Sequence, residues 1–257
     1  MSPEGPDLGP RGGLWPEGFG LVQLDEAVST MDEARRLLPD LERPTWVMAH
    51  RQSGGRGRRG RSWQMPEGNL AATLIYRPEA TPHEAAKRSF LAGLALFEAL
   101  AIHVDRTRLS LKWPNDVLLD DRKVAGILLE SAGAGAYVDW LSIGIGVNVA
   151  GVPEGLEAEA FPPISLAEAG AEVTAEEVLT LIAEMFATEE GKLGAFGFPY
   201  LREEWLRHAA RIGEVITARL PDEEVTGRFD TVDMDGNLML ETAEGPRLIA
   251  AADVFWG

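Results

Sequence analysis

The sequence contains no cysteine, which excludes a whole class of bonds and reactions. Without thiols the chain forms no disulfide, no thiolate metal site and no cysteine nucleophile. The four histidines, His50, His83, His103 and His208, have no spacing typical of a metal site. No apolar run approaches the roughly 20 residues of a membrane-spanning helix, and the first residues lack the features of a signal peptide. We therefore expect a cytoplasmic protein without a membrane anchor.

Positive charge is also scarce. The chain has 24 Lys and Arg against 41 Asp and Glu, a net charge of −17. This balance argues against general nucleic-acid binding, because phosphate backbones attract positively charged surfaces. One stretch departs from it: HRQSGGRGRRGRSW, residues 50–63, holds five arginines, four glycines and no acid, so the rest of the chain carries −22.

This Arg/Gly stretch suits an anionic ligand. Glycines let backbone N–H groups approach an anion, and arginines donate paired hydrogen bonds to phosphate or carboxylate oxygens. Together they fit a polyphosphate or a phosphoryl-bearing intermediate. The pattern G-x-G-x-x-G at residues 55–60 also matches a dinucleotide fingerprint, but that motif needs a helix after it. A strand, NLAATLIY, follows instead, and no kinase H-R-D or D-F-G motif occurs.

The position of the stretch argues against a disordered tail. It lies between two segments that read as buried strands, TWVMAH and NLAATLIY. We therefore expect a mobile loop inside a folded domain.

The remaining pattern predicts an α+β fold. Thr30-x-x-Glu33 reads as a capping box that opens a helix. The clearest helix spans residues 81–100, where Thr81 caps, Pro82 takes the first position and Glu84 completes a box. We expect further helices at 174–190, capped by Thr174, and at 198–209. Asp120-Asp121 marks the turn of a hairpin.

The order of elements predicts three segments. Residues 1–19 are rich in glycine and proline and are expected to be flexible. Residues 20–210 form the α+β domain. Residues 211–257 contain only short strands, with a tight turn at Asp235-Gly236, and predict a small β domain that packs on the first.

Four motifs in this order resemble those of biotin–protein ligases: STMDEA, QSGGRGRRGRSW, KWPNDVLLDDRKVAGILLE and IGIGVNV. The resemblance covers residues 20–257. It implies a mixed β-sheet flanked by helices, of the kind shared by these ligases and class II aminoacyl-tRNA synthetases, plus a C-terminal SH3-like β-barrel. Bifunctional members of the family carry an N-terminal winged helix that binds DNA. Only about 20 residues precede the first strand here, so we expect the monofunctional type without specific DNA binding.

The resemblance implies a two-step reaction. The biotin carboxylate attacks the α-phosphate of ATP, with Mg²⁺, to give biotinyl-5′-AMP and pyrophosphate. A lysine of the biotin carboxyl carrier protein of acetyl-CoA carboxylase, or of a related carboxylase, then attacks the mixed anhydride. The resemblance also allows a homodimer.

The resemblance also assigns residues to this reaction. The biotin-binding residues would be Ser29, Thr30, Gln52, Arg56, Gly57, Arg58, Lys123 and Gly126, the first three at the ureido head. The ATP- or adenylate-binding residues would be Arg58, Arg61, Trp63, Asn115 and Asn148. The catalytic residues would be Lys123, Arg58, Lys112 and Asp116, of which Asp116 would hold Mg²⁺ or accept a proton from the incoming lysine.

Several of these residues have a second interpretation. Thr30 is also a helix cap, and Arg59 and Arg61 are equally consistent with solvated side chains. Trp63 would either close over adenine or anchor the loop in the core. Met31 stands where the family often has asparagine.

Two other functions remain open. A lipoate–protein ligase shares the fold and chemistry but lacks the G-R-G-R-x-G-R-x-W loop. An RGG-type nucleic-acid-binding module requires basic charge beyond the loop and interleaved stacking aromatics, whereas the chain outside the loop is acidic.

Overall fold

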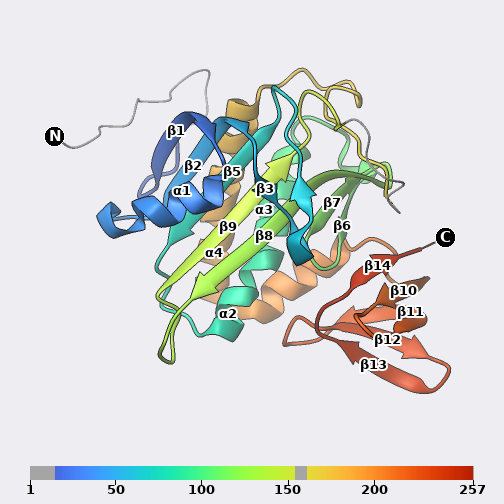
Figure 1. Cartoon of the computed structure of the whole chain (residues 1–257). Coiled ribbons are helices and arrows are strands. Elements are labelled where there is room, and N and C mark those ends of the chain that lie inside the picture. The colour runs from blue at the N-terminus through green and yellow to red at the C-terminus, as the bar shows by residue number, and fades with distance from the viewer. Residues whose placement is uncertain (1–14, 154–160, 257) are drawn as a thin grey trace.

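The computed structural model describes residues 15–153 and 161–256. A mixed seven-stranded sheet forms its centre, with the strand order β1-β2-β5-β9-β8-β7-β6 (Figure 1). Its strands are β1 (Gly20–Ala27), β2 (Thr45–Gln52), β5 (Leu70–Tyr76), β6 (Leu109–Lys112), β7 (Asp116–Leu119), β8 (Arg122–Ala132) and β9 (Trp140–Val147). Strands β1 and β2 are parallel and every other neighbouring pair is antiparallel.

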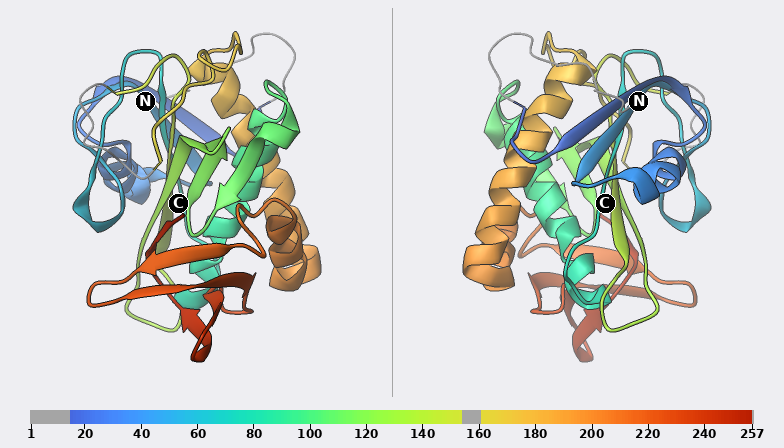
Figure 2. Two further views of the ribbon diagram at one scale, coloured as in Figure 1. Left: turned by 90° about the vertical axis from the view of Figure 1, so that its right-hand side faces the viewer. Right: turned by 90° about the vertical axis from the view of Figure 1, so that its left-hand side faces the viewer.

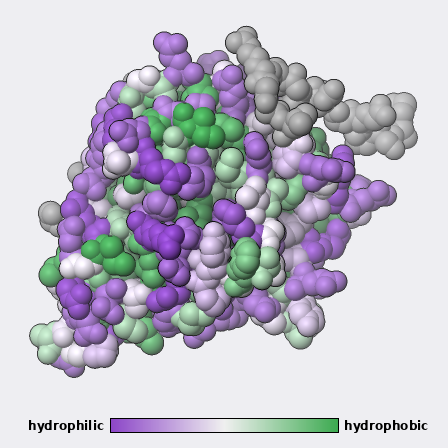
Figure 3. All heavy atoms as spheres, turned by 180° about the vertical axis from the view of Figure 1, so that it is seen from behind, coloured by the Kyte–Doolittle hydropathy of each residue, from purple (hydrophilic) through white to green (hydrophobic). Residues whose placement is uncertain are grey.

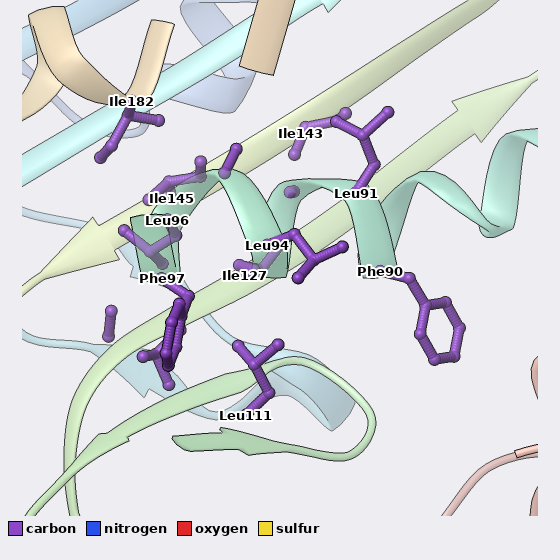
Figure 4. Packing of buried hydrophobic residues seen from close by; sticks show 14 of the residues in the cluster. Phe90, Leu91, Leu94, Leu96, Phe97, Leu111, Ile127, Ile143, Ile145 and Ile182 are labelled. Carbon is purple, nitrogen blue, oxygen red and sulfur yellow. The ribbon is translucent and has the colours of Figure 1, made fainter. Parts of the chain in front are cut away.

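Helices cover both faces of this sheet. The short helix α1 (Thr30–Leu37) lies on one face, and α3 (Arg88–Leu100) and α4 (Ala175–Arg207) lie on the other (Figure 2). Ten of the 13 residues of α3 are buried, as expected for a helix enclosed between a sheet and a second helix. Figure 4 shows part of the buried cluster that α3 shares with the sheet, with Leu91 near Ile143 and Leu96 near Ile145.

Figure 3 shows the molecule from behind, on the side where α4 covers α3 and the sheet. Polar side chains predominate there, and apolar ones gather only in small groups. Among the described residues, no helix is both long enough and apolar enough to cross a membrane.

The predicted helix starts are mostly confirmed. The capping boxes of Thr81 with Glu84 and of Thr174 with Glu177 are both present. The helix expected at 81–100 is divided into α2 (Pro82–Ala86) and α3. The two helices expected at 174–190 and 198–209 form one element, α4, which bends at Gly197, where φ is 73°. The bend explains why the pattern suggested two helices.

The hairpin turn at Asp120-Asp121 is confirmed. Both residues have positive φ, 52° and 58°, and connect β7 to β8. Such a pair is typical of a two-residue hairpin loop.

The C-terminal part forms a separate five-stranded antiparallel sheet, with the order β13-β12-β11-β10-β14, at the lower right of Figure 1. Its strands are β10 (Val215–Arg219), β11 (Glu224–Val232), β12 (Leu238–Thr242), β13 (Gly245–Ile249) and β14 (Asp253–Phe255). The turn at Asp235-Gly236 is confirmed, with a φ of 86° at Gly236. Residues 250–252, between β13 and β14, belong to neither strand.

These two sheets and their helices confirm the α+β class. The boundaries at residues 19/20 and 210/211 stay predictions, and most of the segment expected to be flexible, residues 1–14, lies outside the described residues. The chain that leaves α4 toward the C-terminal part is held to the central sheet, because it exchanges backbone hydrogen bonds with the edge strand β6. Leu111 N donates to His208 O, and Ala210 N donates to Leu111 O, both at 2.8 Å.

Candidate active site

A cavity of about 310 Å³ lies on the α1 side of the central sheet. Its walls come from α1, the Arg/Gly stretch, the β6–β7–β8 hairpins and strand β14 of the C-terminal sheet. Thirteen of the fourteen residues assigned from the sequence line it: Thr30, Gln52, Arg56, Gly57, Arg58, Arg61, Trp63, Lys112, Asn115, Asp116, Lys123, Gly126 and Asn148. Ser29 is not among the lining residues; it is buried beside them.

The floor of the cavity is made by glycines. Along β9, Ile143, Ile145 and Val147 are part of the core, and the intervening Gly144 and Gly146 face the α1 side, as the two-residue period of a strand requires. Gly146 pairs with Gly126 of β8 across the sheet. Without side chains, these positions leave room above the sheet.

The indole of Trp63 occupies part of that room. A Cβ at Gly146 would lie 2.4 Å from Trp63 Cε2, and one at Gly126 would lie 3.3 Å from Trp63 Cζ3. Lys123 Nζ lies 5.5 Å from the centroid of the same ring, within the range of a cation–π contact. In this arrangement Trp63 anchors the end of the Arg/Gly stretch to the sheet.

The polar end of the cavity is built by Thr30 and Gln52. Gln52 Oε1 accepts a hydrogen bond from Thr30 N at 2.8 Å and lies 3.2 Å from Thr30 Oγ1. The predicted capping box of Thr30 is wrong. Ser29 occupies the N-cap position, without a side-chain cap hydrogen bond, and the Thr30 hydroxyl contacts Gln52 and Thr73 instead. The sulfur of Met31 packs on Gly144, 3.0 Å from where a Cβ would lie.

At the cationic end, one carboxylate lies between two lysines. Asp116 Oδ1 is 2.9 Å from Lys123 Nζ, and Asp116 Oδ2 is 3.4 Å from Lys112 Nζ. Burial alone would raise the pKa of Asp116, but the two ammonium groups outweigh it, and the pKa lies below its ordinary value. Burial lowers the pKa of Lys112 despite the neighbouring Asp116. Lys112 Nζ also lies 4.6 Å from the ring centroid of Phe161.

The predicted role of Asp116 as a Mg²⁺ ligand stays a prediction. Its Oδ2 accepts from Lys112, whereas Oδ1, although 2.9 Å from Lys123 Nζ, is buried and makes no hydrogen bond with any described residue. Within residues 15–153 and 161–256, no group of three or more Asp, Glu or His side chains is placed to hold a metal ion. A site for Mg²⁺ normally needs free carboxylate oxygens, waters and substrate phosphates.

Two asparagines and an arginine complete the wall. Arg58 Nη1 lies 3.5 Å from Asn115 Oδ1 and donates to Ala252 O at 3.3 Å. Burial lowers the pKa of Arg58, although Asp253 and Asp116 counteract this effect. Asn148 Nδ2 donates to Lys123 O at 3.3 Å. Its Oδ1 is buried and accepts no hydrogen bond from any residue that the structure describes.

The Arg/Gly stretch is folded back on itself and held from two sides. Strands β3 (Gly55–Arg56) and β4 (Ser62–Trp63) pair around a 3₁₀ turn, Arg58–Gly60. Arg56 donates to both oxygens of Asp32 on α1, at 2.7 and 2.9 Å, and this contact lowers the pKa of Asp32 to about 2. On the other side, Arg59 and Arg61 contact Asp253 of β14 at 3.2 and 2.6 Å.

The cavity is positively charged in an acidic protein. The charged residues that line it are Arg56, Arg58, Arg61, Lys112, Lys123, Asp116 and Asp253. These are five cations and two carboxylates, so the lining carries +3 against −17 for the chain. Such a concentration of cations attracts an anionic ligand.

The comparisons with known proteins agree with this arrangement. Residues 22–148 match the model of the Biotin/lipoate A/B protein ligase family. A Biotin--[acetyl-CoA-carboxylase] ligase of Paracoccus denitrificans is 48% identical over 233 residues, which cover 89% of this chain and 97% of that protein. The chain belongs to the biotin/lipoate protein ligase family.

Further matches place the chain on the biotin side of this family. Residues 212–257 match the biotin protein ligase C terminal domain. The biotin protein ligase of Aquifex aeolicus in complex with biotin and ATP superposes with a TM-score of 0.78 at 27% identity, covering 93% of this chain and 99% of that one. The Bifunctional ligase/repressor BirA of Escherichia coli is 35% identical over 230 residues, 88% of this chain and 70% of that protein.

Sequence reasoning missed four residues that shape this ligase site: Asp32, Thr73, Gly146 and Asp253. Gly146 lies in the motif IGIGVNV, where the alternation of glycine with isoleucine could have identified it. Asp32 lies within the motif STMDEA, as its fourth residue. Thr73 and Asp253 carry no local signal, because each meets its partner only through the tertiary fold.

Proposed function

We propose that this chain is an ATP-dependent biotin–protein ligase that works through biotinyl-5′-AMP. In the first step a biotin carboxylate oxygen attacks the α-phosphorus of ATP, and pyrophosphate leaves. In the second step the amine of a carrier lysine attacks the acyl carbon. A C–N bond forms, the bond between the acyl carbon and the phosphate oxygen breaks, AMP leaves, and the proton lost by the amine passes to solvent. The observation that supports this best is the single cavity that joins a neutral polar end to a cationic end.

Each end suits one part of the adenylate. The neutral end, with Thr30 and Gln52, would hydrogen-bond the ureido head of biotin, and the glycine floor would accommodate the apolar ring. At the cationic end, Lys123 would hold the carboxylate and then the acyl phosphate, with Lys112 and Arg58 on the phosphates. No protein nucleophile is required, because positioning and charge neutralisation account for such a reaction.

We infer that Asp116 organises charge rather than moving protons. Its lowered pKa makes it a weak proton acceptor. Its two ion pairs instead fix the positions of Lys112 and Lys123. Mg²⁺ would enter as the complex of ATP.

The adenine would lie near Asn148. Its buried Oδ1 accepts no hydrogen bond within the described part of the chain, so it is available to accept one from the adenine amino group. Arg61 and Asn115 would contact the adenylate. Trp63 would act indirectly, by anchoring the Arg/Gly stretch to the sheet.

The protein substrate would be the biotin carboxyl carrier protein of acetyl-CoA carboxylase or of a related carboxylase. A cytoplasmic location and a homodimer are compatible with this proposal. Ligand binding tests it and its alternatives at once, since a ligand that binds the folded state raises the melting temperature. Biotin with MgATP should raise it by several degrees. A larger shift with lipoate and MgATP, or with RNA, would support a lipoate ligase or an RGG-type nucleic-acid-binding module instead.

A further inference from the structure

The orientation of the Gln52 amide is fixed by its partner. The atom that faces Thr30 N at 2.8 Å must be an acceptor, because a backbone N–H only donates. Oε1 therefore points to α1, and Nε2 points the other way. Nε2 packs against Gly55, where a Cβ would lie only 2.5 Å from it. Gln52 itself lines the polar end of the cavity.

The hydroxyl of Thr30 is placed between two partners. Its Oγ1 lies 3.2 Å from Gln52 Oε1 and 2.9 Å from Thr73 Oγ1. Thr73 lies on β5 between Val47 of β2 and Gly144 of β9, and it is completely buried.

Only one arrangement of protons satisfies both hydroxyls. Among the described residues, the Thr73 hydroxyl has no hydrogen-bond partner other than Thr30. If Thr30 donated to Thr73, the Thr73 proton would be buried without an acceptor, which is costly. Thr73 therefore donates to Thr30, and Thr30 donates to Gln52 Oε1. The Thr30 oxygen keeps one lone pair and has no proton left to give.

We propose that Thr73 is a positioning residue that sets the hydrogen-bond polarity of the biotin-head subsite. Through this chain the subsite offers an acceptor, Thr30 Oγ1. A ligand that fits must present an N–H to this oxygen, as a cyclic urea does. Thr73 itself is buried behind Thr30 and acts only through it. This inference rests on the proposed function and identifies what selects the urea.

The experiment compares Thr73→Val, which removes the hydroxyl at nearly constant shape, with Thr73→Ser, which keeps it. The readout is biotin-dependent pyrophosphate exchange, with the KM for biotin, the KM for ATP and kcat measured separately. Thr73→Val should raise the KM for biotin about five- to tenfold and leave kcat and the KM for ATP within about twofold. Thr73→Ser should resemble the wild type. The KM for desthiobiotin, which keeps the urea, should rise by the same factor.

Thr217→Val is the matched control. It removes the same kind of inter-threonine contact, 2.9 Å from Thr226, in the C-terminal sheet, and should change none of these constants. If Thr73→Val aggregates, Thr73→Ala removes the same hydroxyl.

Several outcomes would overturn the inference. A wild-type KM for biotin in Thr73→Val would do so, as would an equal loss in Thr73→Ser. A joint loss of kcat, ATP affinity and thermal stability would indicate a purely structural residue. A wild-type protein without biotin-dependent exchange would overturn the proposed function together with this inference, whereas an active wild type with an unaffected valine variant would overturn the inference alone.

Discussion

The carboxylate of Asp253 accepts a hydrogen bond from Arg61 at 2.6 Å, although 192 residues separate the two in the sequence. The same carboxylate contacts Arg59, and the preceding carbonyl, that of Ala252, accepts from Arg58. The C-terminal sheet therefore holds one side of the Arg/Gly stretch, while Asp32 of α1 holds the other. In this structure, arginines that could bind phosphate form ion pairs with carboxylates of the protein itself: Arg56 with Asp32, and Arg59 and Arg61 with Asp253.

Asp253→Asn should loosen the stretch over the adenylate. A less tightly closed site admits water and releases a reactive intermediate, and released biotinyl-5′-AMP acylates exposed lysines at random. We expect stronger biotinylation of a bystander protein such as albumin than with the wild type. Arg58→Gly removes the guanidinium that lies between Asn115 of the central domain and Ala252 of the C-terminal part, and it should likewise increase biotinylation of the bystander.

Asp230→Asn is the control for this assay. It removes an exposed ion pair with Arg228, at 3.5 Å, in the same small sheet and should label albumin no more than the wild type. Equal labelling by the wild type, Asp253→Asn and Arg58→Gly would contradict a closing role for the stretch.

Lys123→Ala should weaken adenylate formation by about 1.5–3 kcal/mol, the usual contribution of a hydrogen bond to a charged group. This corresponds to about a 10- to 150-fold loss in kcat/KM for pyrophosphate exchange. The fold should survive, because the lysine is partly exposed beside a turn. Lys87→Ala, which removes a lysine on the ring of Phe198, should keep full activity. Near-normal exchange in Lys123→Ala would exclude this role.

Gly146→Ala should displace Trp63. The added Cβ would lie 2.4 Å from the indole, and overpacking of this kind costs about 1–3 kcal/mol. We expect a lower melting temperature and a clear loss of pyrophosphate exchange. Gly194→Ala is the matched control, because the added Cβ meets nothing within 4 Å on α4 and should stabilise the helix by about 0.5–1 kcal/mol. A fully active Gly146→Ala variant would show that Trp63 need not lie on this glycine.

The ion pair between Asp32 and Arg56 predicts a pH dependence. The hydrogen bond from Arg56 lowers the pKa of Asp32 to about 2 from an ordinary value of 3.8. The folded state then binds this proton less readily than the unfolded state, so the pair stabilises the fold above about pH 4. The stabilisation is lost as the pH falls towards about 2. Since both side chains are more than a third exposed, solvent screening limits the effect to at most about 1 kcal/mol.

NMR titration of the side-chain carboxyl carbon measures this pKa directly. Asp32 should titrate near pH 2 in the wild type and closer to its ordinary value in Arg56→Gln. An unchanged midpoint in Arg56→Gln would mean that Arg35, the other arginine in contact with Asp32, or another group causes the shift.

The sequence alone determined the class of fold and most of the cavity wall. Its motifs are contiguous, and each encodes local geometry: glycines where a backbone or ring must approach, arginines on one loop, a Thr-x-x-Glu box at a helix start. Thirteen of the fourteen assigned residues line one cavity because each short motif belongs to an element of the same domain. The roles of these residues in catalysis stay predictions.

The tertiary structure alone decided how these residues are connected. A local pattern predicted that Thr30 caps a helix, but its hydroxyl contacts Gln52 and Thr73, which lie 22 and 43 residues away in the sequence. Asp253 reaches the Arg/Gly stretch only because a second sheet packs beside the first. A hydrogen bond or ion pair between distant segments depends on distance in space, and that distance is fixed by the packing of the whole chain, not by the spacing of residues along it.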